Sequence, residues 1–289
     1  MTKFLKSVLL TFAAAALLTG ASVGTVYAKT LNVAIVSDSH LKPSDNPYVF
    51  TPSERNVIFA VNSINKNPDV DFVVFLGDNI DKSNVESLES FMNIVKNLNK
   101  PYYMVFGNHD AYNAGGVDKE DFLKIIHEYN KRSDKDETSY YFRAGKGFYG
   151  LVADGSSYVV PGRHGRYTPE LVDEMEKLFK HKKRDCILLF QHFPLVDPND
   201  NVSHTTLDKE YYENMLSKYD NLVLIASGHF HHKKVTVDER GVYHISAPAL
   251  GARAGSSGSG LYQIIKIDYK KPFLKKPSDV KVEVEDVAI

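Results

Sequence analysis

Five short polar segments, each at the end of an apolar run, hold the side chains of this sequence that are best suited to bind metal ions. They combine carboxylate, imidazole and amide oxygen ligands, which suit Zn, Mn or Fe better than Ca or a thiolate site. One such segment would carry little weight, but five in succession predict a metal-dependent site. In chain order they are Asp38-Ser39-His40, Gly77-Asp78-Asn79-Ile80-Asp81, Gly107-Asn108-His109-Asp110, Gln191-His192 and Gly228-His229-Phe230-His231.

Taken one at a time, these segments differ in strength. Asp38 and His40 alone would be better explained as a turn-capping aspartate beside a surface histidine, and Gly77-Asp78 alone is a weak signal. Asn108-His109 is stronger, because asparagine is an uncommon metal ligand and the adjacent histidine suggests acid-base chemistry. His229 and His231 are two residues apart, which places both imidazoles on the same side of an extended segment. It is therefore the set that predicts the site.

Strands and helices must alternate to position these segments. Six short apolar runs lack a clean polar alternation, which is typical of strands buried on both faces. Helical spacing of apolar residues follows over 54–66, with Ser53 as a candidate N-cap, and over 84–99, and Thr168-Pro169 opens a further helix. This order predicts an α/β layered sandwich. The apolar runs are 31–36, 72–76, 102–106, 148–153, 186–190 and 222–226.

Each polar segment follows a predicted strand and so lies at its carboxyl end, where open α/β sheets gather ligand sites. The long stretches 41–53 and 111–146 lie beside the first and third segments, and we expect them to form a rim or lid. The C-terminal part is predicted to form hairpins, with strands at 242–245 and 261–269 around a Gly/Ser-rich turn at 255–260. The alternation of Val280, Val282 and Val284 suggests one more strand.

Composition sets broad limits on the kind of protein. The chain has 289 residues, 43% hydrophobic and 25% charged, which excludes disordered and coiled-coil classes. Its formal charge of −1 gives no support to a broad nucleic-acid-binding surface. The single cysteine, Cys186, lies in an apolar run, so no intramolecular disulfide is possible and core packing is its expected role.

Residues 1–28 have the features of a signal peptide. Lys3 and Lys6 form a basic start, Val8 to Leu18 an apolar core, and Ala28 ends an acceptable cleavage site. The apolar core is well short of the ~20 residues that a membrane-spanning helix needs. We therefore expect export to the periplasm or the extracellular space, cleavage after Ala28 and no stable membrane anchor. The mature protein is predicted to be a domain over 29–289.

The ordered set of segments resembles the calcineurin-like metallophosphoesterase superfamily, whose signature runs D-x-H, GD-x-x-D, GNH-D/E, H and GH-x-H. The resemblance covers about 30 to 270 and implies a double-layered β sandwich flanked by helices, with a two-metal site at one edge. Within the superfamily, the sequence looks most like class III cyclic nucleotide phosphodiesterases. Three segments carry this finer resemblance: Gly162 to Phe179, Gln191-His192-Phe193-Pro194, and Ile245 to Leu250.

The resemblance also implies roles for individual residues. His109 would face the phosphate, to stabilise developing charge or protonate the leaving group, and Asp81 would orient His109. The cofactor would be two divalent metal ions, with Mn, Fe and Zn as the candidates. One ion would be held by Asp38, His40 and His231, the other by Asn108, His192 and His229, and Asp78 would bridge the two.

These roles imply a phosphodiesterase that acts on nucleotides or other small phosphoesters, with a hydroxide bridging the two metals as the in-line nucleophile. A phosphomonoesterase or a protein phosphatase on the same site is the alternative that the sequence leaves open. A non-catalytic metal-binding protein is disfavoured, because a degenerate scaffold should have lost ligands and none is missing here. Sequence alone leaves the substrate, the metals and the oligomeric state open.

Overall fold

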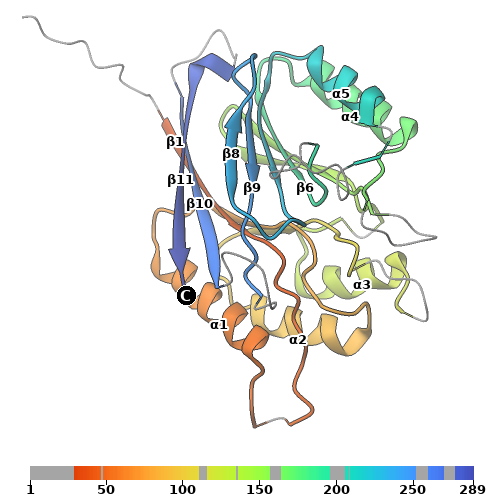
Figure 1. The fold of residues 1–289 in the computed structure, drawn as a ribbon, viewed down its shortest axis with the longest axis vertical. Helices are drawn as coiled ribbons and strands as arrows, with labels where there is room; N and C mark the ends of the chain where they lie inside the picture. Colours follow the sequence, from red (N-terminus) through yellow and green to blue (C-terminus); the bar gives the residue numbers. More distant parts are fainter. Residues whose placement is uncertain are drawn as a thin grey trace, which may run out of the picture.

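Two β sheets stack face to face, and helices cover the outer face of each (Figure 1). The arrangement is that of a computed structural model of the chain. It confirms the predicted double-layered sandwich. The structure describes residues 29–289 except 47, 111–115, 135, 157–163, 196–205, 208, 252–259 and 270–276.

The first sheet has the strand order β11-β10-β1-β2-β3. The three strands that precede predicted site segments, β1, β2 and β3, run parallel, whereas β10 is antiparallel to β1 and β11 is antiparallel to β10. The strands are β1 Lys29–Val36, β2 Phe72–Phe75, β3 Tyr102–Met104, β10 Leu261–Tyr269 and β11 Val280–Ala288.

The second sheet has the order β4-β5-β6-β7-β9-β8. Its four inner strands are parallel, and β4 and β8 join antiparallel at the two edges. The strands are β4 Tyr140–Gly145, β5 Phe148–Ala153, β6 Cys186–Gln191, β7 Leu222–Ser227, β8 Lys234–Val237 and β9 Tyr243–Ser246.

In the described part of the chain, three helices pack on the first sheet and two on the second, and the buried residues form three hydrophobic cores. Strand β1 shows how one strand serves two of them: Val33 and Ile35 face the other sheet, and Ala34 and Val36 face the helices. Burial on both faces is thus the reason that β1 lacks alternation. The helices are α1 Pro52–Lys66, α2 Val85–Val95 and α3 Lys119–Tyr129 on the first sheet, and α4 Pro169–His181 and α5 Lys209–Ser217 on the second.

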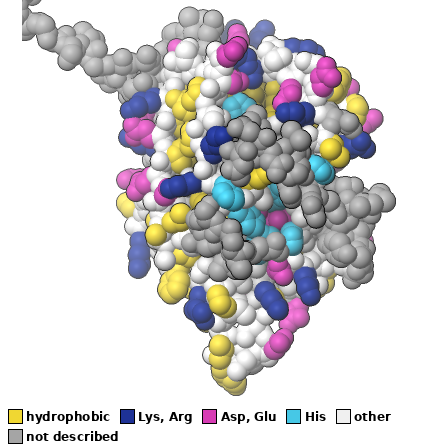
Figure 2. Space-filling view, in the orientation of Figure 1, with side chains coloured by type: hydrophobic (Ala, Val, Ile, Leu, Met, Phe, Trp, Pro, Cys, Tyr) yellow, Lys and Arg dark blue, Asp and Glu magenta, His cyan; other side chains and the backbone are white. Residues whose placement is uncertain are grey.

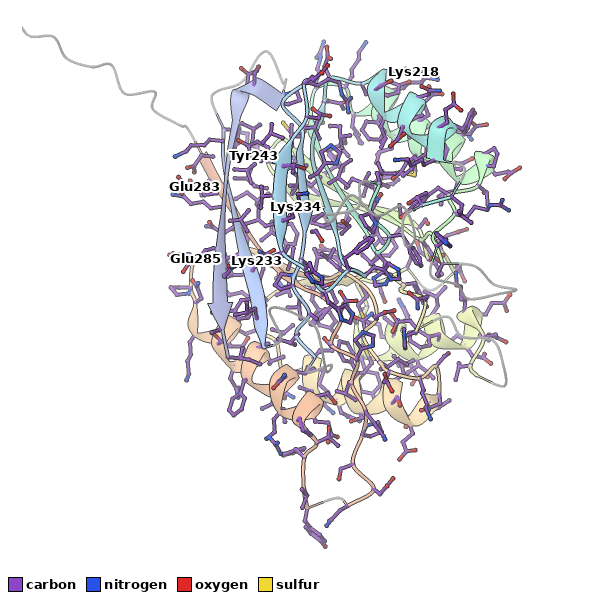
Figure 3. The ribbon with its side chains drawn as sticks, in the orientation of Figure 1. Lys218, Lys233, Lys234, Tyr243, Glu283 and Glu285 are labelled. Atoms are coloured by element: carbon purple, nitrogen blue, oxygen red, sulfur yellow. The ribbon has the colours of Figure 1, made fainter. Side chains whose placement is uncertain are left out.

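Cys186 is buried in the core between the sheets, as predicted. Two sheet edges meet on one side of the sandwich, where Lys233 beside β8 forms an ion pair with Asp286 of β11 (Figure 3). Glu283 and Glu285 add further charge to β11, and charged edge strands resist pairing with other chains. No helix in the described ranges is long and apolar enough to cross a membrane.

Three local predictions need correction. The N-cap of α1 is Thr51, because Thr51 and Glu54 form a reciprocal capping box, while the Ser53 hydroxyl accepts from the backbone of Lys42. Strands β9 and β10 belong to different sheets and do not pair with each other.

The third correction concerns 111–146, which is not simply a rim, because it contributes helix α3 and strand β4. Residues 111–115 and most of the predicted turn at 255–260 lie outside the described residues. Strand β11 confirms the strand expected from the alternating valines.

Candidate metal centre

The carboxyl ends of β1, β2, β3, β6 and β7 bring the five polar segments together at one edge of the sandwich. Loops of the two sheets are bonded there directly: the backbone N–H of His229 donates to Asp38 Oδ2 at 3.0 Å. Within the second sheet, Gly228 N donates to the carbonyl oxygen of His192 at 3.0 Å. Figure 2 shows histidine side chains gathered near the middle of the face in view. The parallel strands therefore carry ligand-type side chains from distant parts of the sequence to one place.

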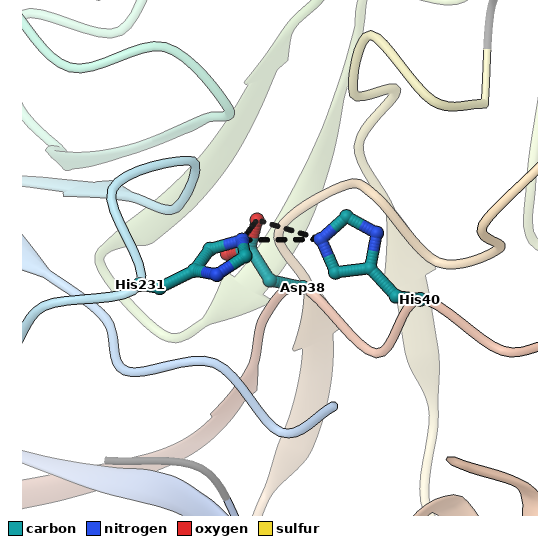
Figure 4. Close-up of side chains that lie close together, drawn as sticks. All are labelled: Asp38, His40 and His231. Atoms are coloured by element: carbon teal, nitrogen blue, oxygen red, sulfur yellow. Dashed lines mark hydrogen bonds and ion pairs between the residues drawn. The ribbon is translucent and has the colours of Figure 1, made fainter. Parts of the chain in front are cut away.

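Asp38, His40 and His231 form the first group of converging side chains (Figure 4). His231 Nε2 lies 3.2 Å from Asp38 Oδ1 and 3.1 Å from His40 Nε2, and His40 Nε2 is 3.9 Å from the same carboxylate oxygen. The three ligand atoms face one another, as donors around a shared cation do. This trio could hold one metal ion.

Asp78, His192 and His229 form the second group. His192 Nε2 lies 3.4 Å from Asp78 Oδ1 and 3.2 Å from His229 Nδ1. The other ring nitrogen of His192 is 2.8 Å from the carbonyl oxygen of Leu76. A hydrogen bond of this kind fixes which nitrogen points at a metal, so His192 presents Nε2 to the group.

Asp78 lies between the two groups. Its Oδ1 faces His192, and its Oδ2 lies 3.7 Å from His40 Nε2 of the first group. The two oxygens of one carboxylate thus point to opposite sides. This is the arrangement that a carboxylate shared by two metal ions requires.

Asn108 provides an independent test of whether cations fit here. Its side-chain oxygen is buried and has no hydrogen-bond partner in the described part of the chain. An unpaired buried amide oxygen costs free energy, and a cation would satisfy it. The next residue, His109, donates its backbone N–H to Asp78 Oδ1 at 2.8 Å, which joins this loop to the centre. The donor set and the unpaired oxygen both fit divalent ions.

The backbone of the site is held in an unusual conformation. Five described non-glycine residues have positive φ, and all five are predicted ligands. This left-handed region is sparsely populated by non-glycine residues, and such strain concentrates at functional sites. The residues are Asp38 (50°), His40 (41°), Asp78 (50°), His229 (72°) and His231 (59°).

Two glycines permit the close packing of the loops. A Cβ on Gly107 would lie 2.2 Å from Asp78 Oδ1, and a Cβ on Gly77 would lie 2.6 Å from His192 Nδ1. Gly77 also has a positive φ of 92°. A side chain at either position would displace a group of the site, which explains the glycine in both segments.

The electrostatics of the site balance buried carboxylates against histidines. Burial acts to raise the pKa of Asp38, but its hydrogen bond and charge interaction with His231 lower that pKa to about 2. Burial also disfavours charge on Asp78, yet His192 holds the pKa of Asp78 well below its usual value. Burial acts to lower the pKa of His192, and the carboxylate of Asp78 raises it to about 9. Both carboxylates are therefore ionised and ready to bind cations.

His109 and Asp81 are close, but their contact differs from the expected one. His109 Nδ1 lies 2.8 Å from the backbone carbonyl oxygen of Asp81, whereas the Asp81 carboxylate is 4.0 Å away. That carboxylate is 3.8 Å from His40 Nδ1. The bond that orients His109 thus comes from the backbone of Asp81, and the predicted role of the carboxylate stays a prediction.

Asp110 closes the third segment, and the sequence analysis assigned it no role of its own. It is buried and accepts hydrogen bonds from Gly107 N (3.0 Å), Ile80 N (3.2 Å) and Asn79 Nδ2 (3.0 Å). These bonds tie the loop after β2 to the loop after β3. Burial, aided by the charge of Asp78, raises the pKa of Asp110 to about 7. Its position after His109 was the only available signal.

We expect Asp110→Ala to lower the free energy of unfolding by roughly 3 kcal/mol or more, because three donors lose their acceptor and each unsatisfied buried group costs about 1–3 kcal/mol. Urea unfolding of metal-free protein at pH 4 measures this, since the carboxyl group is then neutral in the folded protein and, close to its ordinary pKa of 3.8, partly neutral in the unfolded chain, so relief of buried charge is small. Asp220→Ala, at an exposed aspartate, is the control. Equal stability of the two variants would contradict the tethering role.

Comparison with known proteins identifies this arrangement. A sequence model of the calcineurin-like phosphoesterases matches residues 31–233, a range that contains every predicted site residue. The chain belongs to the calcineurin-like phosphoesterase family. It is thus a metal-dependent phosphoester hydrolase, and its grouped His and Asp side chains can hold metal.

Two relatives in sequence and one solved structure are similar to this chain. A probable glycerophosphodiester phosphodiesterase of Arcobacter nitrofigilis is 26% identical over 213 residues, 71% of this chain and 73% of that protein. A probable cyclic nucleotide phosphodiesterase of Fibrobacter succinogenes is 22% identical over 224 residues, 74% of this chain and 78% of that protein. The crystal structure of a dimetal phosphatase from Danio rerio has a TM-score of 0.63 at 15% identity, covering 89% of this chain and 98% of that one, which supports the fold.

Proposed function

We propose that this hydrolase cleaves small phosphodiesters with two divalent metal ions, for which Mn, Fe and Zn are the candidates. The main support for this proposal is the position of Asp78, whose two carboxylate oxygens face the two separate groups of ligand-type side chains. The relatives described as glycerophosphodiester and cyclic nucleotide phosphodiesterases support a diester as the substrate.

In this proposal the chain's own residues divide into holders of metal and a group for proton transfer. Asp38, His40 and His231 hold one ion, Asn108, His192 and His229 the other, and Asp78 both. The ions would act as Lewis acids toward the phosphoester and the attacking water. His109, with Nδ1 bonded to the Asp81 carbonyl oxygen, presents Nε2 toward the substrate to stabilise developing charge or to protonate the leaving oxygen.

A panel assay tests the proposed reaction. Mature protein, stripped with EDTA and reconstituted separately with Mn(II), Fe(II) or Zn(II), is assayed on cyclic nucleotides, glycerophosphodiesters, bis(4-nitrophenyl) phosphate and phosphomonoesters. We expect kcat/KM to be highest on a diester and activity to vanish without metal. A clear preference for monoesters would instead support the phosphomonoesterase alternative.

We also propose that the enzyme is exported, on the basis of the basic start, the apolar core and the cleavage site at Ala28. Intact-mass spectrometry of the protein isolated from its native host should give a chain that begins at Lys29. The matched measurement is the distribution of the protein between osmotic-shock, culture-medium and cytoplasmic fractions. A chain that begins at Met1 in the cytoplasmic fraction would refute export.

A further inference from the structure

A pocket of about 570 Å³ adjoins the metal centre on the side of His40 and Asp81. The segment between β1 and α1 forms its other walls, and this segment extends beyond the helices at the bottom of Figure 1. The volume lies within the range of small-molecule sites. Within the predicted rim or lid over 41–53, residues 42–46 and 51–53 line this cavity. Its described lining residues are His40, Lys42, Pro43, Ser44, Asp45, Asn46, Thr51, Pro52, Ser53 and Asp81.

The pocket lies beside the metal centre, with the imidazole ring of His40 between the two. The ring of His40 turns Nε2 toward Asp38 and His231, and its Nδ1 lies on the opposite side of the ring, 3.8 Å from Asp81 Oδ1. A phosphoryl group bound at the metal centre would therefore have this pocket next to it, one imidazole away.

The walls of the pocket are fixed by hydrogen bonds. Lys42 N donates to Ser53 Oγ at 3.0 Å, and Thr51 Oγ1 donates to the Lys42 carbonyl oxygen at 2.7 Å. The backbone N–H of Asp81 donates to the Leu41 carbonyl oxygen at 3.0 Å, which ties the opposite wall to the same segment. These bonds close the segment at its root, so the pocket exists before a substrate binds.

The lining chemistry is polar. One ammonium group (Lys42), two carboxylates (Asp45 and Asp81) and several hydroxyl and amide groups surround the pocket, with two prolines. No Phe, Tyr or Trp is among the described lining residues, and the only aromatic ring there, that of His40, is 5% exposed. A nucleobase is recognised largely by stacking on an exposed aromatic face, and the described lining residues offer none; the exposed rings of Tyr48 and Phe50 lie in the same segment but outside the lining. Hydroxyl groups, in contrast, would meet both donors and acceptors.

We propose that this pocket binds the alcohol moiety of the substrate and that the moiety is a polyol, from glycerol to a sugar alcohol in size, and not a nucleoside. The assignment rests on the proposed phosphodiesterase function and narrows its substrate class. Lys42 and Asp45 are the specificity-determining residues: the ammonium group donates to hydroxyl oxygens, and the carboxylate accepts from hydroxyl hydrogens.

The test compares substrates across variants that remove the pocket's charges. In the double variant Lys42→Met, Asp45→Ala, KM for glycerophosphoglycerol and glycerophosphoinositol should rise roughly tenfold or more, as expected for loss of hydrogen bonds to charged groups. With bis(4-nitrophenyl) phosphate, kcat/KM should change less than about twofold, since that ester has no hydroxyl groups. Lys177→Met, at an exposed position of α4, is the control and should change neither.

Two further outcomes separate this assignment from the proposed function. If the double variant loses activity equally on the polyol diesters and on bis(4-nitrophenyl) phosphate, or loses none on either, the polyol pocket is overturned and the phosphodiesterase function stands. A wild-type preference for cyclic AMP that the double variant retains would have the same meaning. If the wild type hydrolyses no diester, the proposed function fails. Calorimetric binding of glycerol 3-phosphate then still tests the pocket, and affinity unchanged in the double variant would overturn it.

Discussion

Asp78→Asn is expected to lower kcat/KM by about 10³-fold or more and to reduce the bound metal from two equivalents toward one. The carboxylate faces both groups of ligand-type residues, through Oδ1 at 3.4 Å from His192 Nε2 and Oδ2 at 3.7 Å from His40 Nε2. Asparagine keeps the size and one oxygen but loses the charge and one ligand atom. Metal ions contribute several kcal/mol of transition-state stabilisation, which corresponds to this loss in rate.

Elemental analysis and steady-state kinetics on the same preparation measure both effects. Asp71→Asn is a matched control, because Asp71 directly precedes the other end of β2, where it accepts a hydrogen bond from Asn32 N. A variant at Asp78 with full metal content and full activity would exclude the bridging role. Loss of metal without loss of rate would show that one ion suffices.

The parts of this fold that were predictable depend on short-range patterns. Strands such as β1 and β6 are continuous apolar runs because both faces are buried, and that pattern appears in the sequence directly. The site was predictable because polar side chains at the carboxyl ends of parallel strands must share one edge. Asp38 and His229 are 191 positions apart, yet the backbone of one bonds the carboxylate of the other.

The features that were not predictable depend on contacts between distant segments. Whether Thr51 or Ser53 caps α1 is decided by the path of the chain, since the Ser53 hydroxyl is already used by Lys42. Both β9 and β10 have strand character, but only packing decides that they join different sheets. The role of Asp110 comes from two loops that meet only in the folded protein. Sequence patterns carry no information about such pairings.

His109→Ala is expected to lower kcat by roughly 10²–10⁴, the usual range for acid-base groups, and to leave the metal content near normal. The carbonyl oxygen of Asp81 can only accept a hydrogen bond, so Nδ1 of His109 carries a proton and Nε2 is the atom that faces a substrate. The imidazole is 27% exposed, which allows this contact. If His109 protonates the leaving oxygen, the loss should be smaller for a nitrophenyl ester than for an alkyl ester.

One alternative for His109 is a direct metal ligand, because His40, Asp78 and His109 also form a group with converging ligand atoms. A fall in metal content in His109→Ala would support that alternative and refute the acid-base role. A loss of equal size on every leaving group, with metal retained, would indicate stabilisation of developing charge and not proton transfer. His127→Ala, on α3, is the control for the loss of one imidazole.

Asp81→Asn separates two ways in which Asp81 can act. The substitution keeps the backbone carbonyl that bonds His109 Nδ1, so the loss in kcat should be smaller than that of His109→Ala. If the carboxylate acts through His109, the double variant should be no slower than His109→Ala alone. If it acts through His40, whose Nδ1 is 3.8 Å away, the two losses should multiply and metal affinity should fall in Asp81→Asn. We expect the second result, because the Asp81 carboxylate lies 3.8 Å from His40 Nδ1 and 4.0 Å from His109 Nδ1. A double variant with the same kcat as His109→Ala, together with unchanged metal affinity in Asp81→Asn, would decide for the first.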